Sequence, residues 1–155
     1  VLGSGSTADA HHITAPAPGG DGALRCMQLA IEDAGLSSND IASINAHGTS
    51  TPLNDAAEAE ALSKLFGDNG PPVTSTKGIT GHALGAAGAI EATAVLLSFI
   101  HKQIPPTSGF TTPDPEMAEF NLVTGSPQDW EPGPSMSNSF GFGGHNGSIV
   151  LAPTE

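Results

Sequence analysis

The hydrophobic pattern is dominated by one apolar segment, residues 83–100, which has the length of a single helix. Glu91 is its only charged side chain, so this helix has no polar face. A helix of that kind is buried on most of its circumference, and a buried carboxylate requires a cation or a proton. Lys77 lies at the start of the same strand–turn–helix unit. The pattern therefore predicts a central buried helix whose Glu91 has Lys77 as its nearest candidate partner.

The rest of the chain alternates between strand and helix patterns. Apolar residues at helical spacing predict a helix over 23–34, and an acidic turn capped by Asn54 or Asp55 predicts another that ends near Phe66. Strands are expected at 1–8, 41–46, 73–76 and 120–123, with a closing hairpin formed by 135–139 and 147–152. This order predicts an α/β fold with a mixed sheet and right-handed crossovers.

Charge and composition narrow the possible functions. The 155 residues carry a formal net charge of −12, which argues against binding to nucleic acid or to an anionic membrane. No apolar run approaches the roughly 20 residues that a membrane span needs. Cys26 is the only cysteine, so an intrachain disulfide is impossible and a reducing, cytoplasmic compartment is expected. The chain starts without an initiator Met, as if inside a strand, and we expect it to be part of a larger protein.

Reactive or glycine-rich residues follow three of the predicted strands. His47 follows the first of them, Lys77 follows the second, and Phe140 precedes a glycine turn that contains Gly141, Gly143 and Gly144. Ligands bind beyond the carboxyl ends of strands in open α/β sheets, so we expect these residues to line one cleft with His82. Glycine lets the backbone approach a ligand and point its N–H groups at it.

The two histidines suggest what this cleft does. His47 and His82, if neutral, could both donate hydrogen bonds to a developing enolate or oxyanion. Lys77 and Glu91 would hold the rings in the required tautomer. The hydroxyls of Thr49 and Thr51 could bind an amide-bearing substrate, or they could satisfy backbone groups of their own turn.

The adjacent residues His11 and His12 raise a metal hypothesis, which could extend to His47. No cysteine or carboxylate lies at ligand spacing beside the pair, and neighbouring side chains of an extended chain point to opposite sides. We therefore interpret His11 and His12 as a loop histidine and a packed histidine.

Four segments resemble motifs of the elongating β-ketoacyl-acyl carrier protein synthases. Three are strong matches in the family's order: NAHGTSTPLND (45–55), STKGITGHALGAAGAIEA (75–92) and MSNSFGFGGHNGS (136–148). DAHHIT (9–14) matches more weakly. The resemblance implies a thiolase-like fold built from two similar halves. Residues 1–155 resemble the C-terminal half, a mixed sheet with a buried central helix, and lack the half that bears the nucleophile.

The resemblance implies a decarboxylative Claisen condensation of malonyl-acyl carrier protein with an acyl-enzyme, in fatty acid or polyketide elongation. His47 and His82 match the paired histidines of this reaction. Lys77 matches the lysine that supports them, and Glu91 matches its carboxylate partner. Phe140 matches the gating phenylalanine, whose N–H helps to form the oxyanion hole.

The resemblance also implies substrate, cofactor and partner contacts. Thr49 and Thr51 match threonines that hold the phosphopantetheine arm, and Thr14 is expected along the same tunnel. No catalytic cofactor is implied, because phosphopantetheine arrives on the acyl carrier protein. The other implied partners are the N-terminal half and, in the full-length protein, a second copy in a homodimer. A structural monovalent cation is implied near Asn45, Glu91, Ser137 and Asn138.

One departure from the family pattern affects the function. The nucleophilic cysteine is missing, because Cys26 lies in a different element and matches no family motif. We therefore expect the isolated chain to be inactive. The alternative is a non-catalytic partner of the same fold, or a chain-length-determining module, that binds acyl carrier protein.

Overall fold

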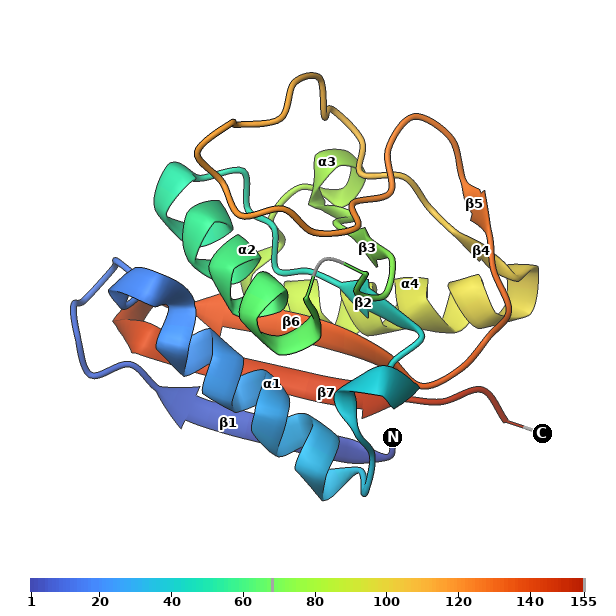
Figure 1. The fold of residues 1–155 in the computed structure, drawn as a ribbon, viewed down its shortest axis with the longest axis horizontal. Coiled ribbons are helices and arrows are strands. Elements are labelled where there is room, and N and C mark those ends of the chain that lie inside the picture. The colour runs from blue at the N-terminus through green and yellow to red at the C-terminus, as the bar shows by residue number, and fades with distance from the viewer. Residues whose placement is uncertain (68, 155) are drawn as a thin grey trace.

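The computed structural model describes residues 1–67 and 69–154, and it forms a mixed α/β fold (Figure 1). The strands are β1 (Gly3–Ala8), β2 (Ser43–Asn45), β3 (Val73–Thr74), β4 (Gln103–Ile104), β5 (Gln128–Asp129), β6 (Ser135–Gly141) and β7 (His145–Leu151). The α-helices are α1 (Asp21–Asp33), α2 (Pro52–Phe66), α3 (Lys77–Thr80) and α4 (Ala87–His101). Short 3₁₀ turns are η1 (Pro18–Gly20), η2 (Ser38–Asp40), η3 (Leu84–Ala86) and η4 (Phe142–Gly144).

The main sheet has the strand order β1-β7-β6-β2-β3. β2 is parallel to both β3 and β6, whereas β7 is antiparallel to β6 and β1. This confirms the predicted mixed sheet and the closing hairpin. The strand expected at 120–123 is wrong in extent, because only Leu122 makes an isolated parallel bridge to Val73.

Helices α1 and α2 cover one face of the sheet, and α4 crosses the other face (Figure 1). The apolar core lies between the sheet and the first pair, and it includes Met27, Ile44, Leu62, Met136 and Val150. α1 packs directly on β1, because a Cβ atom on Gly5 would overlap the carbonyl oxygen of Cys26. The core thus fixes the strand ends that carry the candidate site.

All three predicted helix starts differ from the structure, and α1 begins at Asp21 rather than at residue 23. α2 begins at Pro52 with Thr51 as its N-cap residue, rather than at Asn54 or Asp55. Proline is favoured at the first helical position, where its missing N–H costs no hydrogen bond. α4 begins at Ala87, four residues later than predicted, because η3 intervenes and Leu84 has a φ of 50°.

The expectation that the apolar helix is buried on most of its circumference is wrong for this chain. Only Ala87, Glu91, Val95 and Ser98 of α4 are buried, and their spacing places them on one stripe. Large apolar side chains on its other sides are exposed, namely Ile90, Leu96, Leu97 and Ile100. The window Leu84–His101 is also long and apolar enough to cross a membrane by length and composition, with 22% of it buried. This corrects the expectation that no apolar run has such a length.

Candidate active site

The first predicted site residue, His47, lies in the turn that follows β2. The backbone N–H of His47 donates to Oε1 of Glu58 at 2.9 Å, and the backbone N–H of Gly48 donates to Oε2 of the same carboxylate at 2.9 Å. On the other side, the hydroxyl of Ser75 donates to the carbonyl of Gly48 at 3.0 Å. The turn is therefore held between α2 and the end of β3.

The structure brings three predicted rings together. The ring centroids of His47 and His82 are 5.4 Å apart and nearly perpendicular, and the Phe140 ring lies 5.9 Å from His47. His82 follows α3, and its Nδ1 accepts the N–H of Leu84 at 3.3 Å. A neutral ring in this arrangement carries its proton on Nε2, where it can be donated. His82 lies between α3 and η3, several residues before α4 begins.

The environment of His47 keeps its ring uncharged. Burial lowers the pKa of His47 to about 3, and the charge of Lys77 and the nearby His82 act in the same direction. A neutral imidazole is a hydrogen-bond donor at one nitrogen and an acceptor at the other. The ring can therefore donate to a developing negative charge at pH 7 without first losing a proton.

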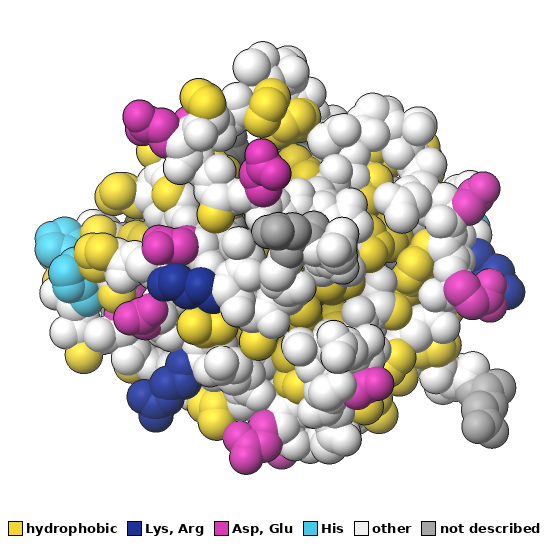
Figure 2. Space-filling view, in the orientation of Figure 1, with side chains coloured by type: hydrophobic (Ala, Val, Ile, Leu, Met, Phe, Trp, Pro, Cys, Tyr) yellow, Lys and Arg dark blue, Asp and Glu magenta, His cyan; other side chains and the backbone are white. Residues whose placement is uncertain are grey.

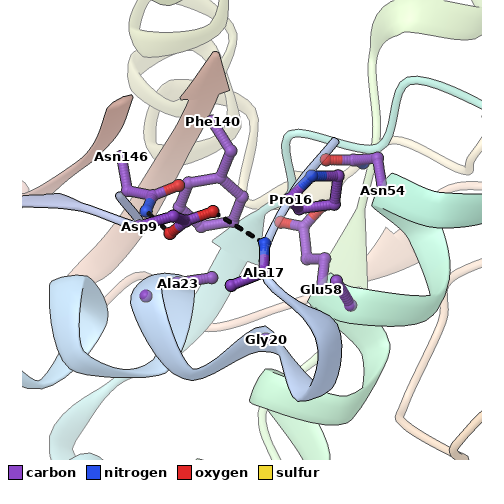
Figure 3. Close-up of a pocket in the computed structure, with 11 residues that line it drawn as sticks. Asp9, Pro16, Ala17, Gly20, Ala23, Asn54, Glu58, Phe140 and Asn146 are labelled. Atoms are coloured by element: carbon purple, nitrogen blue, oxygen red, sulfur yellow. Dashed lines mark hydrogen bonds between the residues drawn. The ribbon is translucent and has the colours of Figure 1, made fainter. Parts of the chain in front are cut away.

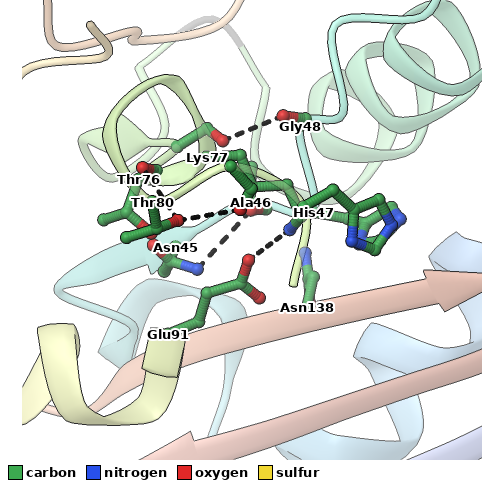
Figure 4. Close-up of polar contacts among 12 residues, drawn as sticks. Asn45, Ala46, His47, Gly48, Thr76, Lys77, Thr80, Glu91 and Asn138 are labelled. Carbon is green, nitrogen blue, oxygen red and sulfur yellow. Dashed lines mark hydrogen bonds and ion pairs between the residues drawn. The ribbon is translucent and has the colours of Figure 1, made fainter. Parts of the chain in front are cut away.

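Lys77 and Glu91 form a buried ion pair, with side-chain exposures of 5% and 2%. Glu91 points from α4 toward the segment that carries Lys77 (Figure 4). Burial raises the pKa of Glu91, and the hydrogen bond and charge of Lys77 oppose that rise. The prediction that the single charged residue of the apolar helix is buried and paired with Lys77 is confirmed.

Three buried oxygens near this pair have no hydrogen-bond partner among the described residues: Oδ1 of Asn45, Oγ1 of Thr76 and Oε2 of Glu91. Oxygen ligands suit hard cations, so Asn45 and Glu91 fit the implied monovalent cation. The side chain of Asn138 is committed elsewhere, because it donates to Glu58 and accepts from Ser148. Ser137 is buried beside it in β6.

The histidine metal hypothesis finds no support. His12 Nδ1 accepts the N–H groups of Thr14 and Ala15, each at 3.2 Å, which makes it part of a local turn. Within residues 1–67 and 69–154, no group of three or more His, Cys, Asp or Glu could hold a metal ion.

The predicted substrate threonines lie on two loops. The hydroxyls of Thr49 and Thr51 are 2.9 Å apart beside His47, and neither is buried. Thr14 is exposed on the loop after β1, with its hydroxyl 3.4 Å from His12 Nδ1. That loop contacts the glycine turn, since Gly143 donates its N–H to the carbonyl of Ile13 at 2.8 Å.

The glycine turn contains a residue that the sequence reasoning missed. Phe140 is half-buried against His47, whereas Phe142 is 78% exposed inside η4. Phe142 is therefore the more exposed ring of this turn, and Phe140 is the ring that packs on the histidine. The second phenylalanine of the SFGFGG segment was the available signal.

Glu58 was also missed. It is 3% exposed on α2, and together with Phe140, Asp9 and Asn146 it lines a small pocket between α1, α2 and the loop after β1 (Figure 3). Burial raises the pKa of Glu58, and the hydrogen bonds from Gly48, His47 and Asn138 oppose that rise. The available signal was a charged residue in line with Ala61, Leu62 and Leu65 at helical spacing.

The sequence matches one family model and a number of known proteins. Residues 1–111 match the family described as Beta-ketoacyl synthase, C-terminal domain. The chain is 46% identical over 157 residues to 3-oxoacyl-[acyl-carrier-protein] synthase 2 of Staphylococcus aureus (strain COL), an alignment that covers 100% of this chain and 38% of that protein. The chain thus spans well under half of this relative.

Solved structures of related proteins agree with these sequence matches. A beta-ketoacyl synthase from Burkholderia phymatum STM815 superposes with a TM-score of 0.95 at 38% identity, over 99% of this chain and 37% of that one. A type II PKS ketosynthase, solved in complex with its acyl-carrier protein and bound to the hexaketide, gives a TM-score of 0.93 at 32% identity, over 99% and 38%. These matches confirm the thiolase-like, C-terminal-half fold.

Proposed function

This chain belongs to the β-ketoacyl synthase family as its C-terminal domain, and we propose that it supplies the His-His-Lys machinery of an elongating β-ketoacyl-acyl carrier protein synthase. The observation that carries the proposal is the meeting of two imidazoles, 5.4 Å apart, beside a buried Lys77–Glu91 pair. The reaction is the decarboxylative condensation of malonyl-acyl carrier protein with an acyl-enzyme. It serves chain elongation in fatty acid or polyketide synthesis.

In each step negative charge develops on the substrate at a place where the N–H groups of the two histidines can stabilise it. The bond between the malonyl α-carbon and its carboxylate breaks, CO₂ leaves, and the electron pair moves onto the thioester as an enolate. His47 and His82 donate their N–H groups to the enolate oxygen. The α-carbon then attacks the acyl thioester of the N-terminal half, a carbon–carbon bond forms, and the cysteine thiolate leaves.

Lys77 acts on His47 rather than on the substrate. Its positive charge contributes to the low pKa of His47, which keeps that ring in the neutral, donating form. Glu91 balances the buried ammonium group, since an unpaired buried charge would be costly. A monovalent cation at Asn45 and Glu91 would compensate the remaining carboxylate oxygen, and no step of the reaction depends on it.

Substrate binding involves the exposed rim of the site. The hydroxyls of Thr49, Thr51 and Thr14 contact the amide-bearing phosphopantetheine arm, and the backbone of Gly141, Gly143 and Gly144 lies close to its thioester end. The ketosynthase structure solved with its acyl-carrier protein supports a carrier protein as partner. On the face that α1 and α2 cover, Lys and Arg are few and interspersed with Asp and Glu (Figure 2), and the chain has four Lys and Arg in total, so a basic surface for an acidic carrier protein is either local or on the N-terminal half.

The exposed apolar side of α4 supports an N-terminal half as the second partner. Ile90, Leu96, Leu97 and Ile100 would be buried by such a layer, which would also supply the nucleophilic cysteine. Homodimerisation belongs to the complete enzyme.

The test combines this chain with a cysteine-bearing half, or uses the complete protein that carries it, and measures malonyl-dependent condensation. His47→Ala and His82→Ala should each lower the rate by about 10²–10³, the usual effect of losing one oxyanion donor. The control His101→Ala changes an exposed histidine at the end of α4 and should have no effect. Tight binding of carrier protein without turnover, in a folded pair, would instead establish the non-catalytic alternative.

A further inference from the structure

We propose that Asn69 is a site of spontaneous deamidation, at which the side-chain amide is converted to a carboxylate through a cyclic imide. Asn69 is exposed in the connection between α2 and β3, and Gly70 follows it. The modification adds one negative charge to a chain whose formal net charge is −12. The inference is independent of the function proposed for the histidines.

The reaction needs only these two adjacent residues and water. The backbone nitrogen of Gly70 loses its proton and attacks Cγ of Asn69, so a new C–N bond forms and the bond from Cγ to Nδ2 breaks. The amide nitrogen takes up a proton and leaves as ammonia. Water then opens the imide at either carbonyl and gives aspartate, or isoaspartate in which the backbone runs through the side chain. Glycine favours the attack because it has no side chain to hinder it.

The local structure allows the attack. α2 ends at Phe66, and the exposed Gly67 that follows has a φ of 67° with nothing within 4 Å of a Cβ atom. The N–H of Gly70 donates to the carbonyl of Gly67 at 3.3 Å, which is long for a hydrogen bond of this kind. β3 begins at Val73, so Asn69 and Gly70 lie outside the sheet. The attacking nitrogen is therefore held only weakly.

The second Asn-Gly pair of the chain lacks this freedom. Asn146 is 6% exposed in β7, where it lies opposite Thr7 of β1 and Phe140 of β6. Its Nδ2 donates to Oδ1 of Asp9 at 2.6 Å. Because its backbone and its amide are both held, the nitrogen of Gly147 cannot reach Cγ unless two strand pairings open. The same dipeptide is therefore reactive in one place and protected in the other, and the fold decides which.

The modification changes the chain just before it enters β3. Isoaspartate adds one methylene group to the backbone between α2 and the strand that leads to Lys77. Val73 is anchored beyond that point, because its N–H donates to the carbonyl of Asn121 and its carbonyl accepts the N–H of Val123, each at 2.8 Å. The added length is therefore confined to the connection. α2 and α4 lie on opposite faces of the sheet, so an N-terminal half on α4 leaves this connection exposed (Figure 1).

The experiment incubates the complete protein in mildly alkaline buffer and follows each asparagine by peptide mapping. Isoaspartate is detected by enzymatic methylation of its α-carboxylate. Asn69 should react at least about 100-fold faster than Asn146, whose reaction requires local opening of the sheet. The matched control for exposure is Asn39, which is exposed in η2 but precedes Asp40. Asn39 should react at least about 10-fold more slowly than Asn69, because the Asp40 side chain hinders the attack.

A second arm separates the effect of the fold from that of the sequence. In denaturant the two Asn-Gly pairs should react at rates within about fivefold of each other, because the unfolded chain protects neither. Asn69→Gln, which would have to close a larger ring, should abolish the isoaspartate signal of the folded protein. Failure of Asn69 to react in the folded protein would overturn the proposal. So would equal or faster reaction at Asn146, or a preference for Asn69 that persists unchanged in denaturant. None of these results depends on whether the enzyme condenses its substrates.

Discussion

The site contains two buried glutamates that are stabilised in different ways. Glu91 on α4 pairs with the ammonium group of Lys77, whereas Glu58 on α2 accepts, among the described residues, only uncharged N–H donors. Burial raises the pKa of both carboxyls. A cation partner balances charge and influences the field at His47, while amide donors fix the backbone. One glutamate is therefore held by a charged partner, and the other by neutral N–H groups.

The largest effect should come from removing the ammonium group of Lys77. Lys77→Met leaves Glu91 buried and unpaired, and breaking a buried pair in this way costs about 3–5 kcal/mol. Denaturant unfolding of the complete protein measures the loss. The control Lys102→Met breaks a pair with Glu131 whose side chains are 64% and 86% exposed, and it should leave stability nearly unchanged. Equal losses in the two variants would contradict the assignment.

The geometric side can be tested without touching Glu58. Gly48 has a φ of 41°, and a Cβ there would lie 2.6 Å from the Ser75 side chain. Gly48→Ala should therefore cost about 1–3 kcal/mol and also displace His47. Gly35→Ala is the matched control, because Gly35 has a φ of 68° with nothing within 4 Å of the new Cβ. Decarboxylation should fall only in the Gly48 variant, and a similar fall in both would refute a local effect.

The low pKa of His47 makes stability depend on pH. The folded value of about 3 lies below the ordinary value of 6.5, so below pH 6.5 the unfolded chain binds a proton that the folded ring does not. The contribution of the neutral His47 ring to the free energy of unfolding is fully present above pH 6.5. It is lost as the pH falls toward 3, by at most about 1.4 kcal/mol per pH unit. Unfolding at pH 7 and pH 5 should show a smaller difference in His47→Gln, and an unchanged difference would argue against a buried neutral ring.

The smallest effect should come from the threonine hydroxyls on the exposed rim of the site, which lie apart from both glutamates. Thr49→Val or Thr51→Val removes one hydroxyl of an exposed pair that is 2.9 Å apart. Loss of one uncharged hydrogen bond to the pantetheine arm should raise KM by about 2- to 10-fold with little change in kcat. Steady-state kinetics with malonyl-carrier protein measure this. A fall in kcat at constant KM would place these hydroxyls in the chemistry instead.

The sequence allowed much of this site to be predicted, because its signals are local. His47 and Lys77 follow strands, and Glu91 interrupts an apolar helix, so their burial and convergence could be inferred. Glu58 was missed because its partners are backbone N–H groups of a distant turn, which leave no mark in the sequence. The outer side of α4 was mispredicted because periodicity shows that a face is apolar but not which polypeptide covers it.

The most direct test of the central claim is a double-mutant cycle on His47 and His82, read out as the rate of malonyl decarboxylation by the complete enzyme. If both rings act on one oxygen, the losses should be strongly non-additive, so that the double alanine variant is little slower than either single variant. Fully multiplicative losses, or single variants that retain wild-type rates, would contradict a shared site for the developing negative charge.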